Sequence, residues 1–312
     1  MYFQILPDEA RVVTPSQARL NAFAARHLEI RMFHVGHGEC ILVVFPNNNC
    51  WLVDCGSGTR SGSNEALARN VVNYLVSNGL QLDAIVATHP HSDHAMAFTT
   101  ILEDPSPNIA NRLTIYRSND PGWFDRTRQW LPPYHRAVAA FGDEQVLEDE
   151  RINQTIAQNI RAQLFAGSVG RRFYISIFMQ LRFHDARILF TGDAYKPYEI
   201  DLRDGFGAQY FSADVLKITH HGSEDGTDEG VLRSIRPGIA IASTGRGGRH
   251  QLEHITRTNI RRGHPRVRVY ETYRNQHQLV NERDIILTTD GLPINGAGVL
   301  YRRQLVAPAF GD

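Results

Sequence analysis

The chain has 312 residues, of which 42% are hydrophobic, and its 33 basic and 33 acidic residues balance one another. This composition predicts a folded globular protein and excludes an intrinsically disordered chain. The sequence contains no apolar run of about 18 residues, so we expect no membrane span. Residues 1–19 lack the basic-then-apolar pattern of a signal peptide. Three cysteines do not make a disulfide framework, which favours a reducing, cytoplasmic location.

The first predicted elements are strands. Residues 1–27 are expected to form an N-terminal extension without chemistry of their own. Alternating or continuous apolar patterns then predict strands over residues 28–33, 40–45 and 50–54. Asp54 ends the third strand, where its carboxylate either orients a ligand histidine or caps a turn. A helix is expected over residues 64–77, which have apolar residues at helical spacing.

The stretch Thr88-His89-Pro90-His91-Ser92-Asp93-His94 follows a short apolar run that predicts a buried strand. Three imidazoles and one carboxylate packed this closely are costly to bury unless they bind something. Histidine nitrogen and aspartate oxygen are typical zinc ligands and also suit manganese. The stretch therefore predicts a divalent metal site, with His89 and His91 facing one ion and Asp93 and His94 facing a second. The alternative is a histidine-rich surface turn.

The segment from residue 103 to 172 differs in character from its neighbours. It contains a proline-rich break, a turn with aromatic residues at 119–124, and two stretches with helical spacing, 126–141 and 148–165. We interpret it as a helical insertion packed over the site, in the manner of a lid. His135 lies within it and is expected to be a surface or core histidine.

Three further sets of polar residues follow predicted strands. The strand over 187–190 runs into Thr191-Gly192-Asp193, where a carboxylate could bridge two cations. The strand over 213–219 runs into His220-His221-Gly222-Ser223; adjacent side chains of a strand point opposite ways, so one imidazole could ligate a metal and the other face a substrate. The strand over 239–243 leads to a Gly/Arg loop that ends at His250.

Basic residues are concentrated late in the chain. Residues 246–274 contain eight arginines and two glutamates. Such a run is either a solvated helix face or a patch that tracks phosphates. Lys217 is one of only two lysines; it either holds a phosphate or is a structural residue of its strand.

Taken together and in this order, the motifs resemble those of the metallo-β-lactamase superfamily, and within it the ComEC-like hydrolase branch. The segments that carry the resemblance are Phe33–Ile41, Leu52–Gly56, His89–His94, Thr191–Asp193, Ala213–Lys217 and His220–Ser223. The first of these departs from the pattern of the branch, because His34, His37 and Glu39 replace the usual Asp, Gln and Asp. The resemblance implies an α/β (α+β) protein with an αββα sandwich, two mixed sheets flanked by helices, in a single domain over residues 1–312.

The same resemblance implies two divalent metal ions, Zn²⁺ by default or else Mn²⁺. His89, His91 and His220 would hold the first ion, Asp93, His94 and His250 the second, and Asp193 would bridge them. Asp93 and His221 are the expected catalytic residues, with His221 contacting the scissile phosphate or protonating the leaving group. Lys217, Arg246 and Arg249 would bind phosphates of the substrate.

The expected function is that of a metal-dependent nuclease or phosphodiesterase that cleaves DNA with a hydroxide activated by two metals. Protein partners in a defence or DNA-processing system would fit such an enzyme, and no membrane is expected. Two alternatives remain at this point. One is a hydrolase of small esters, lactones or phosphodiesters, in which residues 103–172 close a pocket. The other is a metal-binding module without catalysis.

Overall fold

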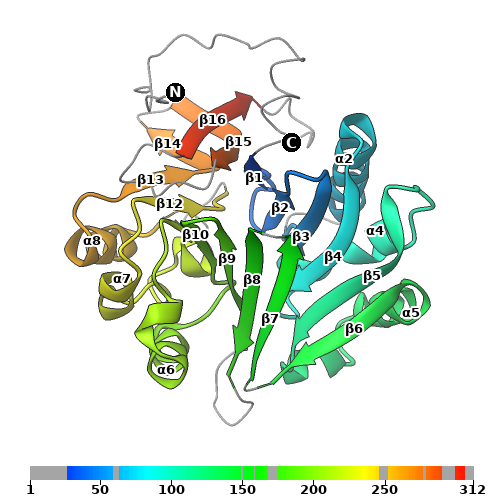
Figure 1. Ribbon diagram of the computed structural model, residues 1–312, viewed down its shortest axis with the longest axis horizontal. Helices are drawn as coiled ribbons and strands as arrows, with labels where there is room; N and C mark the ends of the chain where they lie inside the picture. Colours follow the sequence, from blue (N-terminus) through cyan, green and yellow to red (C-terminus); the bar gives the residue numbers. More distant parts are fainter. Residues whose placement is uncertain are drawn as a thin grey trace.

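The computed structural model describes the chain over residues 27–58, 63–148, 150–157, 159–167, 175–245, 252–276, 279–289 and 299–305. These residues form two mixed β-sheets that pack face to face, with helices on both outer faces (Figure 1). The arrangement is the αββα sandwich that the sequence predicts.

The first sheet has nine strands within the described residues, in the order β14-β15-β1-β2-β3-β4-β5-β6, with β16 beside β15. Strands β3 to β6 run parallel to one another and the other pairs are antiparallel. The bounds are β1 Leu28–Met32, β2 Cys40–Val44, β3 Asn49–Cys55, β4 Gln81–Ala87, β5 Ile109–Ser118, β6 Gly142–Leu147, β14 Tyr273–Gln276, β15 Leu279–Thr289 and β16 Val299–Leu305.

The second sheet has seven strands in the described chain, in the order β13-β12-β11-β10-β9-β8-β7. Strands β10 to β13 are parallel, and β7 to β10 are antiparallel. The bounds are β7 Glu150–Ala157, β8 Ile160–Ala166, β9 Phe178–Phe183, β10 Ala186–Phe190, β11 Val215–Lys217, β12 Ile239–Ala242 and β13 Arg268–Glu271.

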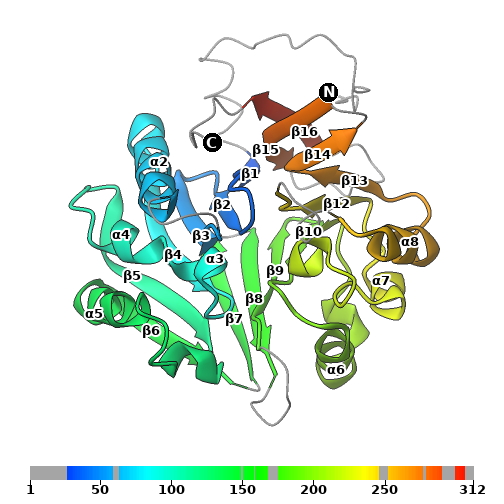
Figure 2. The same cartoon turned by 180° about the vertical axis from the view of Figure 1, so that it is seen from behind.

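Helices cover the outer face of each sheet, as Figures 1 and 2 show from opposite sides. Helices α2, α4 and α5 lie against the first sheet, and α6, α7 and α8 against the second. No helix in the described part of the chain is long and apolar enough to cross a membrane. The bounds are α2 Ser63–Asn78, α3 Ser92–Ala95, α4 Phe98–Leu102, η1 Pro121–Phe124, α5 Leu131–Phe141, α6 Lys196–Phe206, η2 Ala208–Tyr210, η3 Thr219–Gly222, α7 Glu229–Ile235 and α8 His254–Gly263.

The continuous apolar runs in the sequence arise because the central strands are covered on both faces. In β2, Ile41 and Val43 belong to the core between the sheets, while Leu42 belongs to the core under α2 and α4. In β3, Val53 belongs to the core between the sheets and Leu52 to the core under α2 and α4. A strand with two buried faces needs apolar residues at consecutive positions, so alternation is lost.

The expected helix over residues 148–165 is wrong, because this segment forms the antiparallel hairpin of β7 and β8. Its apolar residues Ile152, Ile156, Ile160 and Leu164 recur every four positions. A spacing of four suits one face of a helix, but it is also an even number and so suits one face of a strand. The region 103–172 therefore supplies four strands to the two sheets, β5 and β6 to the first and β7 and β8 to the second.

Candidate metal centre

The loop after β4, residues Thr88–His94, carries four of the predicted ligands and is called the metal loop below. Asp54, at the end of β3, holds it from beneath. The Asp54 carboxylate accepts hydrogen bonds from the backbone N–H of Thr88 at 2.8 Å and from its hydroxyl at 2.7 Å. It also lies 2.8 Å from Nδ1 of His94, which leaves Nε2 of that ring directed into the site. Asp54 thus orients the ring of His94, a candidate ligand.

Two glycines let the backbone of the metal loop approach its neighbours closely. A Cβ added to Gly56 would lie 2.5 Å from the carbonyl carbon of Asp93, and one added to Gly38 would lie 2.4 Å from the carbonyl oxygen of Gly56. The carbonyl oxygen of Asp93 also accepts a hydrogen bond of 2.9 Å from the backbone N–H of Glu39. The metal loop is therefore supported by close backbone contacts in addition to the side chain of Asp54.

The second sheet contributes Asp193 after β10 and the histidine pair after β11. The backbone N–H of Asp193 donates to the hydroxyl of Ser176 at 3.1 Å. His220 and His221 lie in η3, past the end of the strand, and both have left-handed backbone conformations, with φ of 49° and 51°. The prediction that their side chains point opposite ways is wrong, because the pair is not part of a strand.

Each of these two imidazoles is fixed through its Nδ1 atom. Nδ1 of His220 lies 2.7 Å from Oδ1 of Asp225, and Nδ1 of His221 lies 3.1 Å from the carbonyl oxygen of Ser243. Both Nε2 atoms are thereby presented to Asp193, at 3.9 Å for His220 and 3.3 Å for His221, measured to Oδ2. A histidine that binds a metal through one ring nitrogen is usually oriented by a hydrogen bond from its other ring nitrogen.

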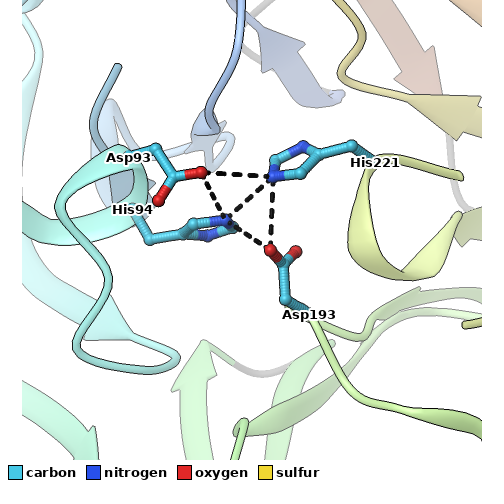
Figure 3. A group of neighbouring side chains, drawn as sticks. All are labelled: Asp93, His94, Asp193 and His221. Carbon is cyan, nitrogen blue, oxygen red and sulfur yellow. Dashed lines mark hydrogen bonds and ion pairs between the residues drawn. The ribbon is translucent and has the colours of Figure 1, made fainter. Parts of the chain in front are cut away.

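The carboxylate of Asp193 is the point where the loops of the two sheets meet (Figure 3). Its Oδ2 atom lies 3.0 Å from Nε2 of His94 and 3.9 Å from Nε2 of His89. Two sets of side chains that share Asp193 have ligand atoms within 4.8 Å of one another: His89, His91 and Asp193, and Asp93, His94, Asp193 and His221.

The donor set fits divalent cations. It consists of imidazole nitrogens and carboxylate oxygens, which are the ligands of zinc and also suit manganese. Nε2 of His89 is fully buried and has no hydrogen-bond partner among the described residues, an arrangement that is costly in a protein interior. Burial lowers the pKa of His89 well below its usual value, so this imidazole is in the neutral form that binds metals.

The charges within the cluster act on one another strongly. Burial alone would lower the pKa of His94, but the carboxylates of Asp193 and Asp54 raise it well above its usual value. Burial would likewise raise the pKa of Asp193, and the imidazoles of His221 and His94 instead hold it well below its usual value. Divalent cations in the same place would provide positive charge beside the carboxylate of Asp193.

Two residues from the first motif also reach the site, although the sequence analysis treated them only as departures from a pattern. Nε2 of His37 lies 2.9 Å from Oδ2 of Asp93, and its ring meets that of His221 edge to face, with centroids 5.5 Å apart. Glu39 lies fully buried behind the site. Both residues lie in the strand–turn motif before β2, and this position is the sequence feature that could have identified them.

Lys217 is fully buried, which favours its structural role over contact with a substrate. Its Nζ lies 2.6 Å from Oε2 of Glu39 and 3.6 Å from Oδ1 of Asp193, and it donates a 2.8 Å hydrogen bond to the carbonyl oxygen of Gly192. Burial would lower the pKa of Lys217, but the carboxylates of Glu39 and Asp193 raise it. Burial raises the pKa of Glu39 to about 7 against the opposing charge of Lys217. Lys217 therefore keeps its positive charge next to the carboxylate of Asp193.

An open pocket of ≈ 590 Å³ leads to the cluster. Its lining consists of His37, His91, Asp93, Asp193, His220, His221, Ser223, Glu224 and Glu253. The candidate ligands therefore face a space that a substrate could enter.

The remaining predicted site residues are not part of this geometry. Arg246, Arg249 and His250 lie outside the described residues, and their roles stay predictions. His135 is half-buried, and its Nε2 lies 2.8 Å from the carbonyl oxygen of Trp123, in agreement with the expected structural role.

Comparison with known proteins gives a family match over part of the chain. Residues 35–159 match the model of the metallo-beta-lactamase superfamily. Recombination protein 2 of Haemophilus influenzae is 28% identical over 231 residues, which are 73% of this chain and 26% of that protein. ComE operon protein 3 of Bacillus subtilis is 26% identical over 264 residues, which are 79% of this chain and 32% of that protein. The chain thus spans less than one third of the length of either relative.

One solved structure superposes well enough to support the fold. The long form RNase Z from yeast superposes with a TM-score of 0.50 at 8% identity, over 89% of this chain and 49% of that chain. The metallo-beta-lactamase fold protein YhfI from Bacillus subtilis gives a TM-score of 0.49 at 14% identity, over 78% of this chain and 96% of that chain.

Proposed function

Since the chain carries a metallo-beta-lactamase superfamily domain of the ComEC-like type, we propose that it is a metal-dependent phosphodiesterase that cleaves DNA. The observation that carries the proposal is the position of Asp193, whose Oδ2 atom lies within 4 Å of imidazole nitrogens from both sheets. A carboxylate between two sets of imidazoles suits a pair of cations.

We assign the ligands from the described geometry. Asp193 serves both ions; His89, His91 and His220 complete one set, and Asp93, His94 and His221 the other. His221 thereby moves from the predicted role in leaving-group protonation to a ligand role, and His250 stays a further predicted ligand. Zn²⁺ suits this histidine-rich set best, and Mn²⁺ is the alternative.

When bound, two divalent cations would supply the acidity that activates water and the positive charge that stabilises a phosphorane-like transition state. The chain's own residues position these groups. Asp54 fixes the ring of His94, and Lys217 supports the carboxylate of Asp193. His37 belongs to neither ligand set, and its side chain is 30% exposed where it lines the pocket, so we assign it to contact with the scissile phosphate.

Two observations favour DNA as the substrate. One relative is named for recombination, a process that acts on DNA. In addition, exposed arginines on α8, on β13 and in the turn between them offer charge for a phosphate backbone. They are Arg261, Arg262, Arg266 and Arg268. Arg257, in contrast, is committed to Glu271, with which it makes hydrogen bonds of 2.7 and 2.8 Å.

A cytoplasmic location is part of the proposal. Cys40, Cys50 and Cys55 are free and buried, and the sulfur atoms of Cys40 and Cys55 lie 3.2 Å apart without a bond between them. A small and odd number of cysteines suits a reducing compartment.

The test is incubation of the purified protein with single- and double-stranded DNA in the presence of Mn²⁺ or Zn²⁺. We expect cleavage by the wild type and a loss of more than about 100-fold in His89→Ala and Asp193→Asn, because changes that only reach metal ligands indirectly already cost 10- to 100-fold. Metal content, measured by mass spectrometry, should fall in the same two variants.

Asp185→Asn and His254→Ala are matched controls, since both residues are exposed. Absence of cleavage by the wild type, or equal cleavage by the ligand variants and the controls, would contradict the proposal. Turnover of chromogenic esters or small phosphodiesters without cleavage of DNA would instead identify a small-molecule hydrolase.

A further inference from the structure

An exposed aromatic residue stands beside the metal loop. The side chain of Phe124, at the end of η1, is 65% exposed, more than any other large hydrophobic residue in the described part of the chain. Single exposed apolar residues are common on protein surfaces, so the case for a binding role rests on how the ring is held and on what lies beside it.

The turn that carries Phe124 is firmly anchored. Trp123, the preceding residue, is fully buried and stacks on Tyr134 with ring centroids 5.2 Å apart. Its indole N–H donates to the hydroxyl of Ser118 at 3.2 Å. The carboxylate of Asp120 caps the turn by accepting a 2.7 Å hydrogen bond from the backbone N–H of Gly122. Phe124 is therefore held outward by its neighbours.

The ring of Phe124 is supported from the protein side. It stacks on the imidazole of His135, with centroids 5.9 Å apart and an interplanar angle of 8°. The guanidinium carbon of Arg117 lies 5.4 Å from the ring centroid. A flat ring held in one orientation, with most of its surface open, is what a stacking partner requires.

This ring lies at the same edge of the sheet as the candidate metal centre. Strands β4 and β5 are parallel, and Ala87, the residue before the metal loop, pairs with Arg117. Pro90 lies between His89 and His91 in the metal loop. A Cβ added to Gly122 would lie 2.8 Å from the ring of Pro90 and 3.5 Å from the guanidinium of Arg128. The turn and the metal loop are thus in direct contact.

The charge around Phe124 is positive. Residues 121–136 contain three arginines, at 126, 128 and 136, and a single acidic residue, Asp125. Arg126 and Arg136 are exposed, while Arg128 lies 3.4 Å from Asp125. The surface beside the ring is therefore suited to an anionic chain.

We propose that Phe124, with Arg126 and Arg128, forms a subsite that stacks one base of a single-stranded nucleic acid next to the cleavage site. The inference deepens the proposed function and rests on it for the identity of the substrate. Bases of a duplex are already stacked on one another, so an aromatic platform selects an unpaired segment. The arginines would hold the flanking phosphates.

The test compares two substrates in the wild type, Phe124→Ala and Phe124→Trp: a single-stranded oligodeoxynucleotide and bis(p-nitrophenyl) phosphate. Base stacking on an aromatic residue contributes about 1–3 kcal/mol, which is about 5- to 150-fold in binding. We expect the ratio of kcat/KM for the oligonucleotide to that for the small diester to fall by this factor in Phe124→Ala, mainly through KM, and to recover in Phe124→Trp. Val76→Ala, an exposed apolar residue on α2, is the control and should keep the wild-type ratio.

A binding measurement separates this inference from the proposed function. Binding of labelled single-stranded DNA to the Asp193→Asn variant can be measured by fluorescence anisotropy without turnover. The double variant Asp193→Asn/Phe124→Ala should bind this DNA about 5- to 150-fold more weakly than Asp193→Asn. An unchanged ratio and unchanged binding in Phe124→Ala would overturn the subsite while leaving the phosphodiesterase intact. Equal weakening for duplex and single-stranded DNA would also overturn it.

Discussion

The two halves of the candidate metal centre are built in different ways. The first-sheet half is one contiguous loop, Thr88–His94, whose backbone rests on that of Gly38 and Gly56. The second-sheet half consists of Asp193 and the pair His220–His221, which follow different strands. Behind this second half lie the buried side chains of Lys217, Glu39 and Glu199.

The difference shows two ways of fixing ligands. A contiguous loop brings its own ligands together and needs only a surface on which it fits. Ligands from separate strands must be aligned with one another by other groups. Here two buried side chains provide this alignment: Lys217 lies beside Asp193, and Glu199 contacts Thr219 at the start of η3. Three substitutions sharpen this comparison, two directed at the second half and one at the first.

The largest effect is expected for Lys217→Met. The substitution removes the cation from a buried set that includes Glu39 and Asp193, and breaking a buried ion pair costs about 3–5 kcal/mol. We expect the free energy of unfolding at pH 8, measured with urea, to fall by this amount.

Two variants control this measurement. Lys196→Met removes the chain's other lysine, a more accessible one on α6, and should have little effect. The double variant Glu39→Gln/Lys217→Met should recover part of the loss. If Lys217→Met alone were as stable as the wild type, charge would not be what supports the second half.

Glu199→Gln tests the support beneath η3. Burial raises the pKa of Glu199 from 4.5 to about 7, so the folded protein binds a proton that the unfolded chain has already released. Glu199 should therefore contribute a decline of about 3 kcal/mol to the stability of the wild type as the pH rises from 4.5 to about 7. Glu199→Gln should lack this contribution, while that of Glu39 remains, and it should be more stable than the wild type at pH 8, because the amide can still accept from the N–H of Asp228 and donate to Thr219.

The measurement is urea unfolding of both proteins at pH 4.5 and pH 8. Glu65→Gln, an exposed glutamate on α2, is the control and should follow the wild type at both pH values. Parallel pH dependence in Glu199→Gln and the wild type would show that Glu199 is not the group responsible.

Gly56→Ala is directed at the first half. Its new Cβ would meet the backbone of Asp93 and His94 at 2.5 Å, so the metal loop has to shift. We expect metal affinity, measured by calorimetry, to fall by about 10- to 100-fold, as it does when the supports of ligands are disturbed. Gly205→Ala, in α6 with open space around it, should bind metal like the wild type.

The sequence brings the candidate ligands of the first half together by itself, since they are neighbours in the chain. For the second half it identifies Asp193, His220 and His221 but not the direction of the two imidazoles. The alternating geometry of a strand was assumed for them, whereas β11 ends at Lys217 and the pair lies in a left-handed turn. The roles of His37 and Lys217 depend on which residues of distant loops they meet, and no local pattern contains that information.

The fold shows the same limit. Segments whose apolar residues fit one period, such as β1 and α2, were predicted correctly. The segment 148–165 was not, because a four-residue spacing is compatible with both periods. Its true state depends on pairing of β8 with β9, a contact with a part of the chain that the local pattern does not include.

The left-handed backbone of His220 and His221 sets stability against function at these two positions. A non-glycine residue costs about 1–2 kcal/mol in this conformation, and two consecutive ones add to the cost. Glycine or asparagine would relieve the backbone, but either would remove an imidazole from Asp193. Selection for a more stable chain and selection for an active one therefore favour different residues here, and the surrounding packing has to compensate for the choice of histidine.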